Sequence, residues 1–133
     1  ELINTEHRLI LVGGEFRPLS RTMVGPLTAP VISALHVDKA FMGTIGFTVD
    51  GGMTTTAPNE AFTKEQIMQR ADRIVLLADS SKFGVHSFAC SGRADQINVL
   101  ITDTATDDTR RGLARQGIEL RLAAVETPDA GDD

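Results

Sequence analysis

The chain has 133 residues and a mass of 14.3 kDa, which is the size of one domain built around one hydrophobic core. Hydrophobic residues make up 41% of it, too many for a disordered chain, yet no apolar run approaches the roughly 20 residues that cross a bilayer. The formal net charge is -5, from 18 acidic and 13 basic residues, so the chain as a whole does not attract DNA or anionic lipid.

The N-terminal half alternates apolar runs with segments of turn or helix character. Residues 8–12 predict a strand, because the run is apolar and two glycines follow it. Residues 25–35 predict a short helix with a proline in its first turn. Residues 37–43 predict a second buried strand, and the Gly- and Thr-rich residues 44–58 predict a long loop that holds at most one short strand.

The C-terminal half repeats this alternation. Asn59 is placed to cap a helix over residues 60–70, and residues 73–78 are the clearest buried strand. The sequence then predicts a strand at residues 88–90, a helical turn at 93–96, a strand at 99–102, a helix at 109–116 ended by Gly117, and a last strand at 118–123. Residues 126–133 are expected to form an acidic, flexible tail.

Strands that alternate with helices at this spacing predict an α/β fold with a mostly parallel central sheet and flanking helices. In such sheets, ligands bind beyond the carboxyl ends of the strands. Polar clusters follow three of the predicted strands, at residues 43–59, 79–84 and 102–108. These strand ends are therefore the expected place of a binding site.

The first cluster combines glycines with the start of a helix. Gly43 and Gly46 allow a ligand to approach the backbone closely, and the N-terminus of the following helix favours anions. Lys64 follows Glu60 by four residues, so both lie on one face of that helix. The same two residues also suit an ordinary surface ion pair beside a loop, worth about 0.2–0.5 kcal/mol.

The second cluster, residues 79–84 (DSSKFG), follows the clearest strand. Asp79 and Lys82, with the serine hydroxyls between them, suit a sugar hydroxyl and a phosphate. The same residues also suit a strand exit with a helix cap and a turn glycine. Because both clusters follow strands of one sheet, we favour a shared site. Neither has the glycine spacing of a P-loop or a dinucleotide fingerprint.

The remaining polar residues point to no metal and no cofactor. The three histidines are scattered, and no Cys and His spacing suggests zinc. Cys90 is expected to be buried, and as the single cysteine it cannot form an internal disulfide, which indicates a reducing cytoplasm. Asp107 and Asp108 are expected to be charges at a helix start, and Asp103 suits either a structural hydrogen bond or a ligand contact.

Several short motifs stand in a definite order along the chain. They are residues 38–43 (DKAFMG) with Gly46, residues 52–55 (GMTT), Glu60 and Ala61 with Lys64 and Met68, residues 79–84 (DSSKFG) and residues 101–103 (ITD). This ordered set resembles the effector domain of DeoR-type bacterial transcriptional repressors, over about residues 9–123. The segments LVGG at 11–14 and VGP at 24–26 match the earlier part of that family more loosely.

The resemblance implies a sugar-phosphate-sensing domain over residues 1–125, with a fold shared with ribose-5-phosphate isomerase, glucosamine-6-phosphate deaminase and CoA transferases. In full-length members, an N-terminal winged helix-turn-helix binds operator DNA, and a bound sugar phosphate relieves repression. The resemblance also implies a homo-oligomer. This sequence carries no helix-turn-helix, and the first sensor strand of the family, with its phosphate loop, is expected to precede Glu1.

The resemblance also implies which residues line the pocket: Asp38, Gly43, Gly46, Glu60, Lys64, Asp79 and Lys82. We expect Lys82 and the loop amides to contact the anion, because a lysine is a point charge suited to phosphate. Carboxylates accept hydrogen bonds from sugar hydroxyls, so that role is expected of the three acidic residues.

Two other functions stay open. An isomerase or deaminase on the same fold needs a general base beside a carbonyl. The isomerase resemblance predicts an Asp-Glu pair after the first aspartate, but Lys39 and Ala40 follow Asp38, so we expect no enzyme activity. The second alternative is an oligomerisation module with a vestigial pocket.

Overall fold

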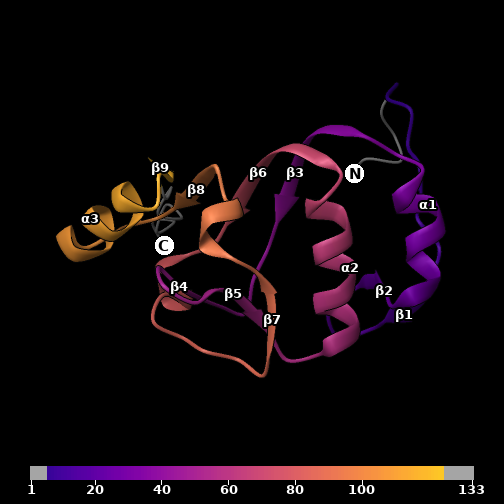
Figure 1. The fold of residues 1–133 in the computed structure, drawn as a ribbon, viewed down its shortest axis with the longest axis horizontal. Coiled ribbons are helices and arrows are strands. Elements are labelled where there is room, and N and C mark those ends of the chain that lie inside the picture. The colour runs from indigo at the N-terminus through magenta and orange to yellow at the C-terminus, as the bar shows by residue number, and fades with distance from the viewer. Residues whose placement is uncertain (1–5, 125–133) are drawn as a thin grey trace, which may run out of the picture.

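A computed structural model describes residues 6–124, so the predicted acidic tail lies outside the described residues. Its centre is a four-stranded parallel sheet in the order β3-β6-β8-β9 (Figure 1). These strands are β3 (Val37–Met42), β6 (Ala71–Leu77), β8 (Val99–Thr102) and β9 (Glu119–Leu122). The predicted α/β fold with a mostly parallel sheet is confirmed.

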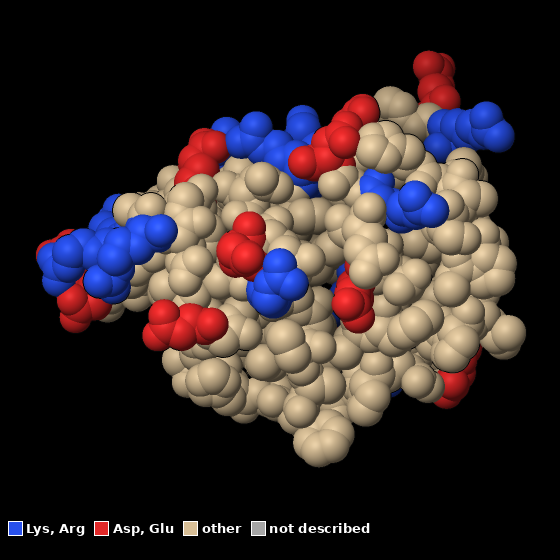
Figure 2. Space-filling view, in the orientation of Figure 1, with Lys and Arg blue, Asp and Glu red and all other residues tan. Residues whose placement is uncertain are grey.

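The hydrophobic core lies on one face of this sheet. Alternate residues of a strand point to the same face, and those of the core face are small or aliphatic, such as Ala40, Ile74 and Leu100. Helix α2 (Pro58–Met68) packs there through Met68, and α3 (Asp107–Arg115) through Leu113. Figure 2 shows that charged side chains gather around α3, at one end of the molecule.

The opposite face of the sheet is more open. Lys39, Phe41, Arg73 and Arg121 point to this side, where they line a hollow of about 180 Å³ together with aliphatic residues of β6 and β8. Phe41 is 65% exposed. The prediction that residues 37–43 form a strand is confirmed, but its expected burial is wrong, because β3 lies at the edge of the sheet and on this open face.

The Gly- and Thr-rich segment, residues 44–58, contains two strands rather than a long loop. They are β4 (Gly46–Thr48) and β5 (Gly52–Thr55), which form an antiparallel sheet with β7 (Ala89–Gly92). The residues of β5 are all buried, because they are sandwiched between neighbouring strands and the core. A composition rich in glycine and threonine indicates a turn, and the loop prediction rested on composition alone. It was wrong because these residues are small enough to pack inside the antiparallel sheet.

The N-terminal region also differs from the prediction. Residues 8–12 form no strand, and Leu11 is 79% exposed. The apolar run pairs with no neighbouring strand within residues 6–124, and a strand needs a partner for its backbone hydrogen bonds. The chain instead forms the hairpin β1 (Glu15–Arg17) and β2 (Thr22–Val24). The predicted helix at residues 25–35 is confirmed as the 3-10 turn η2 (Pro26–Thr28) and α1 (Ala29–Ser33).

Two local predictions need correction. Helix α2 begins at Pro58 with Ala57 at its N-cap, so Asn59 lies inside the helix. Cys90 is exposed rather than buried, because it precedes the buried Ser91 on the edge strand β7, where successive side chains point to opposite faces.

The other predicted elements agree with the structure. The 3-10 turns η3 (Ser80–Lys82) and η4 (Ala94–Gln96) follow β6 and β7. Two aspartates occupy the first turn of α3, as expected, while Thr106 caps it. Within the described part of the chain, no helix is long and apolar enough to span a membrane.

Candidate functional site

An open cleft of about 390 Å³ lies at the carboxyl ends of β3, β6, β8 and β9, where ligands bind in parallel sheets. It is lined by Gly43, Thr44, Leu77, Ala78, Asp79, Lys82, Ile101, Thr102, Asp103 and Ala123. Its lining is mostly apolar, and its polar groups come from the end of β8 and from the loops that follow β3, β6 and β8. Three of the seven predicted site residues, Gly43, Asp79 and Lys82, are therefore brought together.

Asp103 holds two of these loops in place. Its Oδ1 accepts hydrogen bonds from the Ser80 amide at 2.7 Å and from the Thr102 hydroxyl at 3.1 Å, and its Oδ2 accepts from the Ser80 hydroxyl at 3.0 Å. These bonds, the Ser80 amide first, lower the pKa of Asp103 to about 2. Asp103 thus connects the end of β8 to η3. Of the two roles expected from the sequence, the structure shows the structural hydrogen bond.

Asp79 caps η3. Its Oδ1 accepts hydrogen bonds from the hydroxyl and the amide of Ser81, the latter at 3.0 Å. The Ser81 hydroxyl bond, followed by the amide bond, lowers the pKa of Asp79. The amides of Ser80 and Ser81 are therefore already used by carboxylates. Each amide has a single N–H, so an anion would have to displace a carboxylate oxygen to bond to either of these two.

Lys82 supplies the cation of the cleft. Its side chain is half-buried and follows Asp79 by one turn. Within residues 6–124 its ammonium group makes no hydrogen bond and no ion pair. Its positive charge is near enough to help lower the pKa of Asp79, although less than the Ser81 bonds do.

Glu60 and Lys64 line a second cavity, of about 200 Å³, on the other side of the β3 end. Gly43 lines both cavities. The Lys64 ammonium lies 3.0 Å from Glu60 Oε1 and donates to the Gly43 carbonyl at 2.9 Å. Arg17 on β1 donates to Glu60 Oε2 at 3.2 Å. The predicted i,i+4 pair is confirmed, and it belongs to a larger network.

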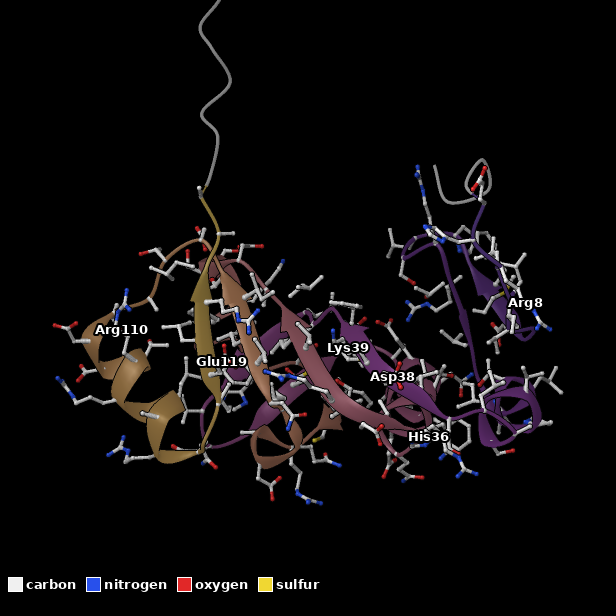
Figure 3. All side chains as sticks on the ribbon, turned by 90° about the horizontal axis from the view of Figure 1, so that it is seen from above. Arg8, His36, Asp38, Lys39, Arg110 and Glu119 are labelled. Atoms are coloured by element: carbon white, nitrogen blue, oxygen red, sulfur yellow. The ribbon has the colours of Figure 1, made fainter. Side chains whose placement is uncertain are left out.

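Two predicted site residues lie elsewhere. Asp38 is exposed near the start of β3, four residues before the strand ends at Met42, which is about 13 Å along a strand (Figure 3). Gly46 is buried in β4, where a Cβ would stand 2.2 Å from the Val85 carbonyl oxygen. Because Gly46 has no side chain, two backbone segments can approach each other closely at this point. Gly46 lines neither cavity.

Sequence reasoning missed Arg17 and left the role of Asp103 open. Arg17 is 43 residues from Glu60, and no motif marks it. The signal for Asp103 was its place directly after a predicted strand, which is the position that parallel sheets use for polar contacts. Within the described residues, no group of three acidic, His or Cys side chains could hold a metal ion.

Comparison with known proteins agrees with this fold. Residues 1–104 match the family model of the DeoR C terminal sensor domain. The chain is 33% identical over 119 residues to the HTH-type transcriptional regulator GlpR of Haloferax volcanii, which is 89% of this chain and 47% of that protein. It is 32% identical over 126 residues to the HTH-type transcriptional repressor GlcR of Bacillus subtilis, 94% of this chain and 47% of that protein.

A third relative is the lactose phosphotransferase system repressor of Streptococcus mutans, 33% identical over 108 residues, 81% of this chain and 43% of that protein. The chain thus spans less than half the length of each of these relatives. The family model covers well over half of the chain and includes β3, β6 and β8, whose ends form the cleft. The chain belongs to the family of DeoR C-terminal sensor domains.

Proposed function

We propose that residues 1–125 form the effector-binding domain of a DeoR-family transcriptional repressor and that the cleft binds a phosphorylated sugar or a related intermediate of sugar metabolism. Occupancy of the cleft then controls DNA binding by an N-terminal helix-turn-helix of the longer protein. The observation that carries the proposal is Lys82, a cation without an ion-pair partner among residues 6–124, in a cleft that also holds carboxylates.

The residues of the cleft divide by chemistry. Lys82 meets the phosphate as a point charge. Asp79 accepts a sugar hydroxyl through Oδ2, because Ser81 occupies only its Oδ1. Asp103 holds the loops rather than the ligand. The cleft holds one ammonium group and two carboxylates, and the carboxylates repel a phosphate. The affinity for a phosphorylated sugar therefore depends strongly on Lys82.

The arrangement favours a sensor over an isomerase or a deaminase. A general base must reach the proton that it removes. Glu60 is held by Arg17 and Lys64, and Asp38 lies outside both cavities. The hydrogen bonds from Ser81 lower the pKa of Asp79, which makes this carboxylate a weaker base. The relatives compared above are named as transcriptional regulators or repressors, which supports the same choice.

Thermal unfolding with a panel of sugar phosphates and their unphosphorylated parents tests the proposal. A ligand at about 100 times its Kd adds roughly 2.7 kcal/mol, which raises the Tm by several degrees. We expect a shift with a phosphorylated sugar and none with its parent. A shift with no compound would favour an oligomerisation module, and turnover of a sugar phosphate would favour the enzyme.

A substitution assigns the binding to this cleft. Lys82→Ala is expected to weaken the binding of the sugar phosphate at least tenfold, a loss of about 1.4 kcal/mol, measured by calorimetry. Lys39→Ala is the matched control, because Lys39 is an exposed lysine on the open sheet face. Equal affinity of the folded Lys82→Ala variant and the wild type would remove Lys82 from the site.

A further inference from the structure

Three elements meet at one network of charged side chains. Arg17 comes from the β1–β2 hairpin, Glu60 and Lys64 from α2, and the Gly43 carbonyl from the loop after β3. The distances are 3.2 Å from Arg17 to Glu60, 3.0 Å from Lys64 to Glu60 and 2.9 Å from Lys64 to the Gly43 carbonyl. The network therefore reaches from the hairpin to the wall of the Lys82 cleft.

The Glu60–Lys64 pair at the centre of the network is largely shielded from water. The Glu60 and Lys64 side chains are 10% and 15% exposed, so their attraction is screened less than that of surface pairs. The ammonium group of Lys64 already has a carboxylate and a carbonyl as partners. Two of the three N–H donors of Lys64 are therefore already used, whereas Lys82 has no hydrogen-bond partner among the described residues.

Gly43 forms an open part of the cleft wall. A Cβ at Gly43 would meet nothing within 4 Å, so no neighbouring group packs over that side of the residue. The hydrogen bond from Lys64 to its carbonyl restrains the loop, and Glu60 restrains Lys64. Arg17 links the same carboxylate to β1.

We propose that Lys64 is a positioning residue, which holds the Gly43 wall of the effector cleft, and that Glu60 and Arg17 couple this wall to the β1–β2 hairpin. The inference rests on the proposed function in one respect, since it takes the Lys82 cleft as the effector site. A ligand that moves the Gly43 loop alters the Lys64 bond, and the shared carboxylate carries that change to Arg17. The chain directly after the hairpin is also attached to α2, because the Gly25 amide donates to the Thr63 hydroxyl at 2.9 Å.

The ligand-free protein provides the first test, by amide hydrogen exchange. Lys64→Met removes the charge and keeps the chain length. We expect the Ile45 amide, which bonds to the Thr54 carbonyl next to this loop, to exchange about tenfold faster, and the amides of β1 and β2 to exchange faster as well. Lys64→Arg keeps the charge and is expected to restore most of the protection. Unchanged exchange at both places in Lys64→Met would overturn the network, whatever the cleft binds.

The second test measures coupling with a sugar phosphate that stabilises the wild type. Lys64→Met is expected to weaken its binding about fivefold to tenfold, with Lys64→Arg closer to the wild type. Arg17→Met is expected to leave the affinity within about twofold but to abolish the ligand-dependent change in exchange of β1 and β2. Glu65→Gln, an exposed neighbour on α2, is the control.

The outcomes separate the two proposals. If no sugar phosphate binds the wild type while Lys64→Met still loosens the loop, the proposed function fails and the positioning role of Lys64 stands. If a sugar phosphate binds and Lys64→Met binds it as the wild type does, the positioning role fails and the proposed function stands. If the ligand still changes the hydrogen exchange of β1 and β2 in the Arg17→Met variant, the proposed coupling through Arg17 is overturned.

Discussion

Two glycines of the predicted site, Gly43 and Gly46, offer a matched test of how the structure uses small residues. At Gly46 a Cβ would stand 2.2 Å from the carbonyl oxygen of Val85, 2.8 Å from its carbonyl carbon and 3.0 Å from the Thr54 hydroxyl. Two of these atoms belong to the backbone, so they cannot move away by changing a rotamer. At Gly43 a Cβ would meet nothing within 4 Å.

The free energy of unfolding should separate the two positions. In Gly46→Ala, β4 and the segment at Val85 must separate by about 1 Å, and overpacking of this kind costs about 1–3 kcal/mol. The bond from the Gly84 amide to the Phe47 carbonyl, at 2.9 Å, lies beside this contact, and its loss adds about 1 kcal/mol. We therefore expect Gly46→Ala to lose roughly 2–4 kcal/mol. Gly43→Ala should lie within about 1 kcal/mol of the wild type, because alanine also restricts the unfolded chain.

Urea unfolding followed by far-UV circular dichroism measures both variants, since the chain has no Trp or Tyr for fluorescence. The m-value must stay constant for the comparison to report stability alone. A Gly46→Ala variant within about 0.5 kcal/mol of the wild type would refute the reasoning. So would a Gly43→Ala variant that loses as much as Gly46→Ala.

Two further predictions concern Asp103 and Cys90. The pKa of Asp103 is lowered in the folded state, so its charged form stabilises the fold above its unfolded pKa of about 3.9, and that stabilisation is lost as the pH falls toward 2. Asp103→Asn should therefore be less stable than the wild type at pH 7, with a difference that narrows in acid unfolding between about pH 4 and 2; a constant difference would contradict the assigned bonds. The exposed Cys90 should react with a thiol reagent in the native protein at a rate close to that of the unfolded chain, and protection by 100-fold or more would place it in the interior.

Local patterns were enough to predict much of the parallel sheet. Residues 74–78 and 99–101 are apolar throughout, because the strands they belong to lie inside the sheet with neighbours on both sides. Polar residues after these runs placed Asp79 and Lys82 at the carboxyl ends of the strands, and the structure brings both into one cleft. These predictions needed only the pattern of apolar and polar residues along the chain and the general geometry of parallel sheets.

The predictions that failed depend on neighbours far along the chain. Residues 8–12 have the composition of a strand, but no strand pairs with them in the described structure. Residues 44–58 have the composition of a loop, yet β4 and β5 are buried there because β7, more than 30 residues later, completes their sheet. Asp38 shares a motif with Gly43, but an extended strand holds the two apart.

The sequence by itself determined the alternation of strands and helices, the polar residues at strand ends and the Glu60–Lys64 pair, because each depends on residues a few positions apart. Only the tertiary structure decided that Lys64 bonds to the Gly43 carbonyl, that Arg17 completes the network and that Asp103 fixes η3. These contacts join residues 21, 43 and 23 positions apart. The energy of such a contact depends on distance and burial in space, and a linear pattern records neither.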